Sequence, residues 1–198
     1  MPARVRRYNP QLATLTDVAP SGPEWIHELK YDGYRIGAIV AGSRVRLESR
    51  REIDWTARFP EVVEAVRQLA CRSAVIDGEV AITEPSGRTS FQKLQNIFEK
   101  AGGRAGLTYY VFDLLELDAA DLTKLPLEQR KALLEKLVDD GDSLSNIRVT
   151  SKATARTSSS TLAGWAARGS YRSAEVTGTA RDAVTAGSRR SACNAASS

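Results

Sequence analysis

The composition changes abruptly near residue 150, and this change limits how much of the chain can form a packed domain. Residues 1–150 contain apolar runs, aromatic side chains and helical periodicity, whereas residues 151–198 are mostly Ser, Ala, Thr, Arg and Gly. The second segment has too few large apolar side chains to offset the conformational entropy that folding costs. We therefore expect a folded body over residues 1–150 and a low-complexity, largely disordered tail over residues 151–198.

The positive charge of the chain is concentrated in the tail. The formal net charge is +4, but residues 151–198 hold seven Lys and Arg against two acidic residues, which leaves the body at −1. The body therefore gives no compositional support for a strongly basic, nucleic-acid-binding surface.

Targeting segments and cysteine frameworks are not expected. No apolar run follows the N-terminal arginines, so we predict neither a signal peptide nor a membrane span, and a cytoplasmic protein without a membrane partner. The two cysteines, Cys71 and Cys193, have no spacing typical of a zinc site or a disulfide framework.

The body reads as an α+β mixture of short strands and helices. Helices are predicted from Pro60 to Leu69, around residues 91–98, and over residues 127–137 with a Glu, Lys and Arg outer face. Residues 74–76 and 80–82 form either a hairpin or one bent strand. The other predicted strands are residues 25–29, residues 34–40 and 44–48 as a hairpin, and residues 109–112, the last of these ending at 113–115.

The most reactive sequence pattern surrounds Lys30, in the run Glu-Leu-Lys-Tyr-Asp-Gly-Tyr-Arg. A lysine at a strand end can be a covalent nucleophile if its amine is neutral, which requires burial or neighbouring cations such as Arg35 and Arg50. Asp32 can orient the amine, Gly33 lets the backbone approach a phosphate, and Arg35 offers a planar fork to phosphate or ribose. From spacing alone, an ordinary surface turn remains the alternative.

Residues 30–35 resemble the first signature motif of the covalent nucleotidyltransferases, the superfamily of DNA ligases, RNA ligases and mRNA capping enzymes. Three further motifs of that superfamily follow in order: Ser49-Arg50, Asp77-Gly78-Glu79 and residues 110–115. Four other segments are similar to bacterial DNA ligases of non-homologous end joining: residues 10–13, 25–28, 54–60 and 126–131. The resemblance covers roughly residues 8–150 and identifies the body as an adenylation domain.

The resemblance implies a fold and a nucleophile. The fold would be α+β, an ATP-grasp-like nucleotidyltransferase domain with antiparallel sheets around a nucleotide cleft, incomplete at the C-terminus. Lys30 would attack the α-phosphate of ATP and carry AMP. Glu28 would lie against the adenine or its exocyclic amine, and Phe112 would stack on the base.

The remaining site residues are also carried over from the resemblance. Arg35 would contact the nucleotide, and Arg50 would contact the nucleotide or the nick phosphate. Glu79 would bind the ribose or help to hold Mg²⁺, whose charge offsets the phosphates. Asp32 and Gly33 would support the nucleophile.

Two later motifs of such ligases, Glu-Gly-x-Val-x-Lys and Trp-Leu-Lys-x-Lys, are not found in the chain as written, nor is an OB-fold domain. A shifted reading frame permits both motifs. A frame that begins at the third base of the Ala167 codon can read GAG GGG ATC GTA TCG AAG, which encodes Glu-Gly-Ile-Val-Ser-Lys. A frame that begins at the third base of the Val184 codon can encode Asp-Ser-Trp-Leu-Lys-Ala-Lys. We therefore infer a frameshift near residues 150–152. The alternative is a genuine basic tail that binds DNA by charge.

The expected function is that of an ATP-dependent DNA ligase, which uses ATP and Mg²⁺ to form lysyl-AMP and seals nicked or broken double-stranded DNA in repair and recombination. End-joining proteins are the candidate partners. We expect the absence of the later motifs to impair this chain. Two alternatives remain. One is a non-catalytic remnant that binds nucleotide weakly. The other is an RNA ligase or capping-type nucleotidyltransferase, which shares the motifs but not the sequence of residues 54–60.

Overall fold

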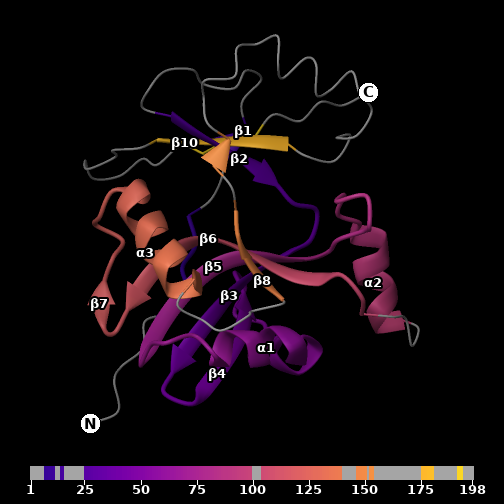
Figure 1. Ribbon diagram of the computed structural model, residues 1–198, viewed down its shortest axis with the longest axis horizontal. Coiled ribbons are helices and arrows are strands. Elements are labelled where there is room, and N and C mark those ends of the chain that lie inside the picture. The colour runs from indigo at the N-terminus through magenta and orange to yellow at the C-terminus, as the bar shows by residue number, and fades with distance from the viewer. Residues whose placement is uncertain are drawn as a thin grey trace.

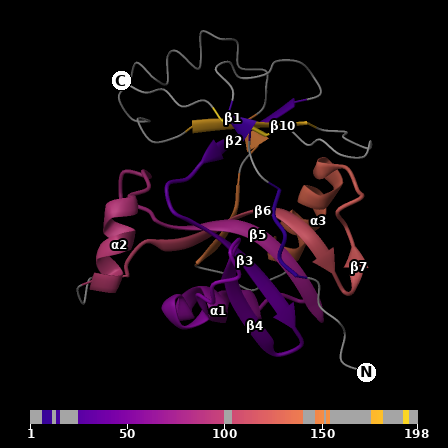
Figure 2. The same cartoon turned by 180° about the vertical axis from the view of Figure 1, so that it is seen from behind.

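The strands of the protein form two sheets, which lie one above the other in both views of the ribbon (Figure 1 and Figure 2). The computed structural model describes residues 7–11, 14–15, 25–99, 104–139, 146–150, 152–153, 175–180 and 191–193. Most strand pairs are antiparallel and helices pack beside them, which confirms the α+β prediction.

The larger sheet has the strand order β4-β3-β5-β6-β7, and β8 pairs with β6 in parallel. The β3–β4 hairpin confirms the prediction for residues 34–48, and Gly42 adopts a positive φ of 60° in its turn, where glycine has no steric cost. The strands are β3 (Tyr34–Ala41), β4 (Arg44–Ser49), β5 (Ser73–Ile82), β6 (Leu107–Leu117), β7 (Ala120–Asp121) and β8 (Ile147–Val149).

Strand β5 decides between the two alternatives left open for residues 74–82. It is one continuous strand, and its pairing with β6 shifts register between Val75 and Ile76 and again between Asp77 and Gly78. The Asp-Gly-Glu motif is therefore inside a central strand. Strand β6 continues to Leu117, so the predicted end at 113–115 is wrong, because residues 114–117 pair with β5 and β7.

The smaller sheet has the order β1-β11-β10-β2-β9, and it contains the strand that ends at Lys30. Strand β10 runs antiparallel to β2, with Glu175 opposite Lys30. The described parts of residues 151–198 are therefore strands. The prediction of disorder for the rest of the tail concerns residues outside the described ranges. The strands are β1 (Thr14–Leu15), β2 (Trp25–Lys30), β9 (Lys152–Ala153), β10 (Glu175–Ala180) and β11 (Ser191–Cys193).

The helices surround the larger sheet, with α2 and α3 on opposite sides of it and α1 beneath it in Figure 1. Helix α1 (Pro60–Arg67) begins at Pro60 as predicted, after the short 3-10 helix η1 (Thr56–Arg58). Helix α2 spans Phe91–Glu99 and α3 spans Leu127–Asp139, and both match the predicted segments. Within the described residues, no helix has the length and apolar character needed to cross a membrane.

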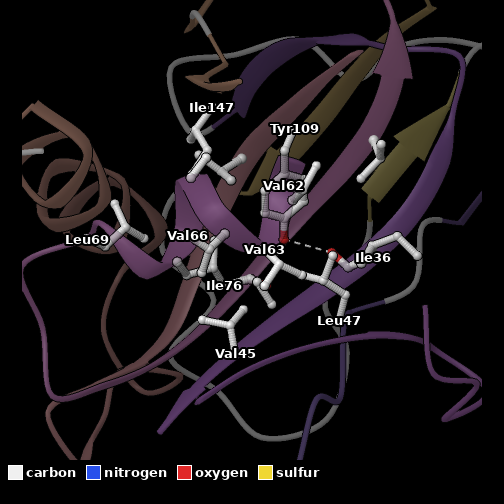
Figure 3. Close-up of a cluster of buried hydrophobic side chains, with 14 of the residues drawn as sticks. Ile36, Val45, Leu47, Val62, Val63, Val66, Leu69, Ile76, Tyr109 and Ile147 are labelled. Atoms are coloured by element: carbon white, nitrogen blue, oxygen red, sulfur yellow. Dashed lines mark hydrogen bonds between the residues drawn. The ribbon is translucent and has the colours of Figure 1, made fainter. Parts of the chain in front are cut away.

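The main core lies between α1 and the larger sheet (Figure 3). Apolar side chains of α1 pack against those of β3, β4 and β5, and the fully buried Tyr109 of β6 projects among them. Its hydroxyl shares one hydrogen bond between two acceptors, the carbonyl oxygens of Ile36 at 2.9 Å and of Ile76 at 3.2 Å. One aromatic side chain thus ties three neighbouring strands together.

Helix α3 departs from the prediction that its Lys and Arg residues lie on the outer face. Arg130 is 4% exposed and Lys131 is 1% exposed, although Lys136 is exposed as predicted. The two cations occupy the positions three and four residues after Leu127 and before Leu134, which is the buried stripe of an amphipathic helix. The sequence spacing therefore did indicate their burial, and both find acidic partners there.

We predict that Leu134→Ala lowers the free energy of unfolding by about 2–5 kcal/mol, because it leaves a cavity under α3. Leu134 is fully buried, whereas its neighbour Leu133 is only partly buried. Leu133→Ala, the matched control, should cost clearly less in the same urea titration. Equal losses for the two variants would contradict the packing described for α3.

Candidate active site

Lys30 is the last residue of β2, where the chain leaves the smaller sheet. The next strand, β3, begins at Tyr34 in the larger sheet, so only residues 31–33 connect the two. The Gly33 amide donates to Oε1 of Glu79 at 2.9 Å, and the Asp32 amide donates to the Thr89 hydroxyl at 2.9 Å. A Cβ atom at Gly33 would lie 2.1 Å from the Val80 carbonyl oxygen, so this connection requires glycine.

A pair of stacked rings holds the residue that follows the lysine. The rings of Tyr31 and Tyr110 lie 3.6 Å apart between centroids, with an interplanar angle of 10°. The Tyr110 hydroxyl in turn shares a 2.6 Å hydrogen bond with the Thr83 hydroxyl. Strand β6, held by the residue that follows β5, therefore supports the chain immediately after Lys30.

The Arg35 guanidinium makes a two-pronged ion pair with Asp77. Its Nε donates to Oδ1 at 3.2 Å and its Nη2 donates to Oδ2 at 2.6 Å, which is the strong fork geometry of an arginine–carboxylate pair. The Tyr8 hydroxyl also donates to Oδ1 of Asp77, at 2.7 Å. The Arg35 side chain is 33% exposed, so one edge of it can still meet a ligand.

Burial and the contact between Arg35 and Asp77 shift the pKa values of this cluster. Burial raises the pKa of Asp77 and opposes the stabilisation of the carboxylate by Arg35 and Tyr8. Burial, followed by the charge of Asp77, raises the pKa of the Tyr8 hydroxyl far above its usual value. For Arg35, burial alone would lower the pKa, but the contact with Asp77 outweighs it and raises the pKa. Arg35 is therefore a fixed positive charge beside the turn.

The Arg35 guanidinium also lies over the ring of Phe112, 5.4 Å from the ring centroid. Phe112 is partly exposed, whereas its neighbours Val111 and Asp113 in β6 are buried. An aromatic ring that keeps one region open beside a cation can accept a flat ligand.

Glu28 is buried against α3. Its Oε1 accepts a hydrogen bond from the Lys131 ammonium and another from the Thr150 hydroxyl, the latter at 3.1 Å. The Lys131 ammonium also donates to the carbonyl oxygen of Phe112 at 2.7 Å. Lys131 therefore connects Glu28 in β2 with Phe112 in β6.

A second ion pair anchors the helix that carries Lys131. Arg130 donates through Nε and Nη2 to the two oxygens of Asp113, at 2.7 and 3.0 Å, and through Nη1 to the Leu125 carbonyl at 2.8 Å. Because Asp113 follows Phe112 in β6, this pair fixes α3 against the strand that carries Phe112.

The structure brings most of the predicted site residues into one connected region. Arg35 contacts Phe112, Lys131 links Phe112 to Glu28, and Glu79 holds the turn after Lys30. Arg50 is solvent-exposed in the turn after β4. The roles assigned to these residues, and that of Asp32, stay predictions.

Several residues of this region were not predicted from the sequence. Asp77 belongs to a recognised motif but was given no role, and its pairing with Arg35 depends on the β3–β5 register. Lys131 was placed on the outer face of α3. Tyr8 and Thr150 lie far from the motifs along the chain and carried no signal of their own.

A magnesium site made by the protein alone is not present in the described ranges, where no group of three or more His, Cys, Asp or Glu side chains could hold a metal ion. Mg²⁺ is commonly bound through one or two carboxylates together with substrate phosphates. The predicted metal role of Glu79 is compatible with this mode of binding.

Known proteins resemble this chain in sequence and in structure. The multifunctional non-homologous end joining protein LigD of Pseudomonas aeruginosa is 40% identical over 133 residues, 67% of this chain but 16% of that protein. DNA ligase 2 of Thermofilum pendens is 37% identical over 128 residues, 61% of this chain and 21% of that protein. The chain thus spans less than a quarter of the length of either relative.

Among solved structures, the ligase domain of LigD from Mycobacterium tuberculosis superposes with a TM-score of 0.70 at 28% identity, over 93% of this chain and 59% of that one. A mycobacterial DNA ligase D complexed with ATP gives a TM-score of 0.71 at the same identity and coverage. A family model described as the ATP dependent DNA ligase domain matches residues 10–164. The chain therefore belongs to the family of ATP-dependent DNA ligase domains, as its motifs predict.

Proposed function

We propose that this chain binds ATP between its two sheets and transfers AMP to Lys30, as the first step in sealing DNA breaks. The observation that carries the proposal is the position of Lys30 at the end of β2, two residues after Glu28 and separated by only residues 31–33 from the strand that bears Arg35. Positions 28 and 30 belong to the same end of one strand. The base-directed and phosphate-directed residues would therefore approach the nucleotide together.

In the proposed step, the neutral amine of Lys30 attacks the α-phosphorus of ATP. A phosphorus–nitrogen bond forms, the bond from the α-phosphorus to the oxygen bridging to the β-phosphate breaks, pyrophosphate leaves, and the amine proton passes to solvent. Arg35, fixed by Asp77, favours the neutral amine and stabilises the charge on the phosphoryl group. Arg50 would add a second cation from its exposed turn.

The base would occupy the open region at Phe112. Its ring would stack on adenine, while Glu28 would accept a hydrogen bond from the exocyclic amine. Glu79 already holds the Gly33 amide, and we propose that it also faces the ribose or the Mg²⁺ carried by the ATP phosphates. Bound Mg²⁺ would offset the charge of those phosphates.

The names of the relatives support DNA as the final substrate, since they are DNA ligases and an end joining protein. We propose nicked or broken double-stranded DNA as the acceptor of AMP, with end-joining proteins as partners in repair and recombination. The cytoplasm, where ATP and chromosomal DNA meet in bacteria, is the proposed compartment. A non-catalytic remnant that only binds nucleotide is the alternative, and the adduct experiment below decides between them.

We predict that Lys30→Ala abolishes formation of a covalent AMP adduct, because Lys30 is the residue that the motif assigns as the nucleophile. The measurement is incubation with radiolabelled ATP and Mg²⁺, followed by a denaturing gel, on a chain translated in the restored frame after Thr150. Lys124→Ala, which alters an exposed lysine, should leave the adduct intact. Adduct that persists in Lys30→Ala would overturn the assignment of the nucleophile.

In the 198-residue chain we expect at most trace adduct and no detectable nick sealing. The two later motifs would supply a metal-directed glutamate and phosphate-directed lysines, and such electrostatic stabilisation is usually the largest catalytic effect. A gel assay on nicked DNA tests this expectation. Efficient sealing by the chain as written would refute both the frameshift and the need for those motifs.

We predict that Phe112→Ala weakens ATP binding much more than Phe112→Tyr does, because stacking on a base contributes on the order of 1–3 kcal/mol and survives in tyrosine. Equilibrium dialysis with labelled ATP measures both variants. Similar losses in the two would show that Phe112 serves packing rather than base binding.

A further inference from the structure

Lys131 holds a buried ammonium group at the point where the proposed base site meets α3. Its side chain is 1% exposed, and its ammonium donates to Oε1 of Glu28 and to the carbonyl oxygen of Phe112. Burying an ammonium group costs much free energy unless it is paired and hydrogen-bonded. The helix around it is fixed by the Arg130–Asp113 ion pair, so the position of Lys131 is set independently of any ligand.

The two groups that Lys131 binds are those that would define the adenine site. Phe112 would lie against the face of the base and Glu28 against its edge. Lys131 therefore sets the spacing between a stacking ring and a hydrogen-bonding carboxylate, although it is not itself required to touch the nucleotide.

The contacts of Glu28 also determine which oxygen can meet a base. The hydrogen bonds from Lys131 and Thr150 both end on Oε1, and Oε2 accepts neither of them. The oxygen atoms of an ionised carboxylate are acceptors only, and the Lys131 ammonium lies against this one. The carboxylate favours a donor on the base edge, such as the amine at position 6 of adenine, and repels a carbonyl oxygen at that position.

We propose that Lys131 is a positioning residue for nucleotide selectivity: by holding Oε1 of Glu28 in place, it makes the site prefer a 6-aminopurine over a 6-oxopurine. This inference rests on the proposed function, since it requires that ATP binds at Phe112 and Glu28. It assigns to Lys131 an effect on the choice of base, and not on the transfer of the phosphoryl group.

The test measures equilibrium binding to the 198-residue chain, so it does not depend on catalysis. A fluorescent ribose-labelled ATP analogue is bound in the presence of Mg²⁺ and displaced by ATP or by inosine triphosphate, which carries an oxygen at position 6. For the unaltered chain, ATP should displace the probe at roughly tenfold lower concentration than inosine triphosphate, as expected for one charge-assisted hydrogen bond. In Lys131→Met this ratio should fall toward one.

Two further variants keep the result interpretable. Lys136→Met makes the same change at an exposed position of α3 and should retain the full preference for ATP. Glu28→Gln combined with Lys131→Met removes both charges, so it folds even if the single variant does not, because no buried charge is left unpaired. It should also lose the preference for ATP.

Two outcomes would overturn the inference but leave the proposed function intact. In one, a folded Lys131 variant keeps the preference for ATP. In the other, the unaltered chain binds ATP but shows no preference for it. A loss of affinity that is equal for both nucleotides would likewise overturn it, because a purely structural role predicts that pattern. Failure of ATP to displace or bind at all would overturn the proposed function, and the inference with it.

Discussion

The hydrogen bond from the Gly33 amide to the Glu79 carboxylate fixes the place where the chain passes from one sheet to the other. Everything proposed for the site depends on this short crossing. Lys30 ends the strand before it and Arg35 lies in the strand after it, so both are positioned by the same three connecting residues. Because a Cβ at Gly33 would collide with the Val80 carbonyl, the crossing cannot tolerate a larger residue without moving β5.

Strand register then brings together motifs that are far apart in the sequence. In the β3–β5 pair, Arg35 is opposite Glu79 and Gly37 is opposite Asp77. A Cβ at Gly37 would lie 2.2 Å from the Tyr8 ring, so glycine there leaves room for Tyr8 to reach Asp77. A slip of one residue would turn these side chains to the opposite face and separate them. Arg35 of the first motif and the Asp77-Gly78-Glu79 motif therefore meet on neighbouring strands of the larger sheet.

Much of this fold was predictable because local patterns and tertiary packing agree. The hairpin at Gly42, the helix start at Pro60 and the three helical segments all follow from turn chemistry and periodicity. The family also followed from the sequence, since four motifs occur in the expected order. The sequence did not decide whether residues 74–82 form a hairpin or the single strand β5. An Asp-Gly pair favours a turn unless its backbone groups hydrogen-bond to neighbouring strands, as they do here with β3 and β6.

The polar framework of the site was less predictable, because charged residues are assigned to the surface by default. Arg130 and Lys131 are buried only because Asp113 and Glu28 come within reach from two different sheets. No spacing within α3 specifies those partners, although the stripe shared with Leu127 and Leu134 did mark the two positions as inward-facing. The chemistry of Lys30 itself rests on resemblance and on its place in the fold.

The most direct measurement of the central claim is the location of the AMP group. After incubation of the protein with ATP and Mg²⁺, proteolytic digestion and tandem mass spectrometry would identify the modified residue even at trace yield. The account predicts a phosphoramide-linked AMP on the peptide that contains Lys30, and on that residue within it. AMP on a different lysine would contradict the account. A complete absence of adduct would also contradict it, if the chain translated in the restored frame binds ATP.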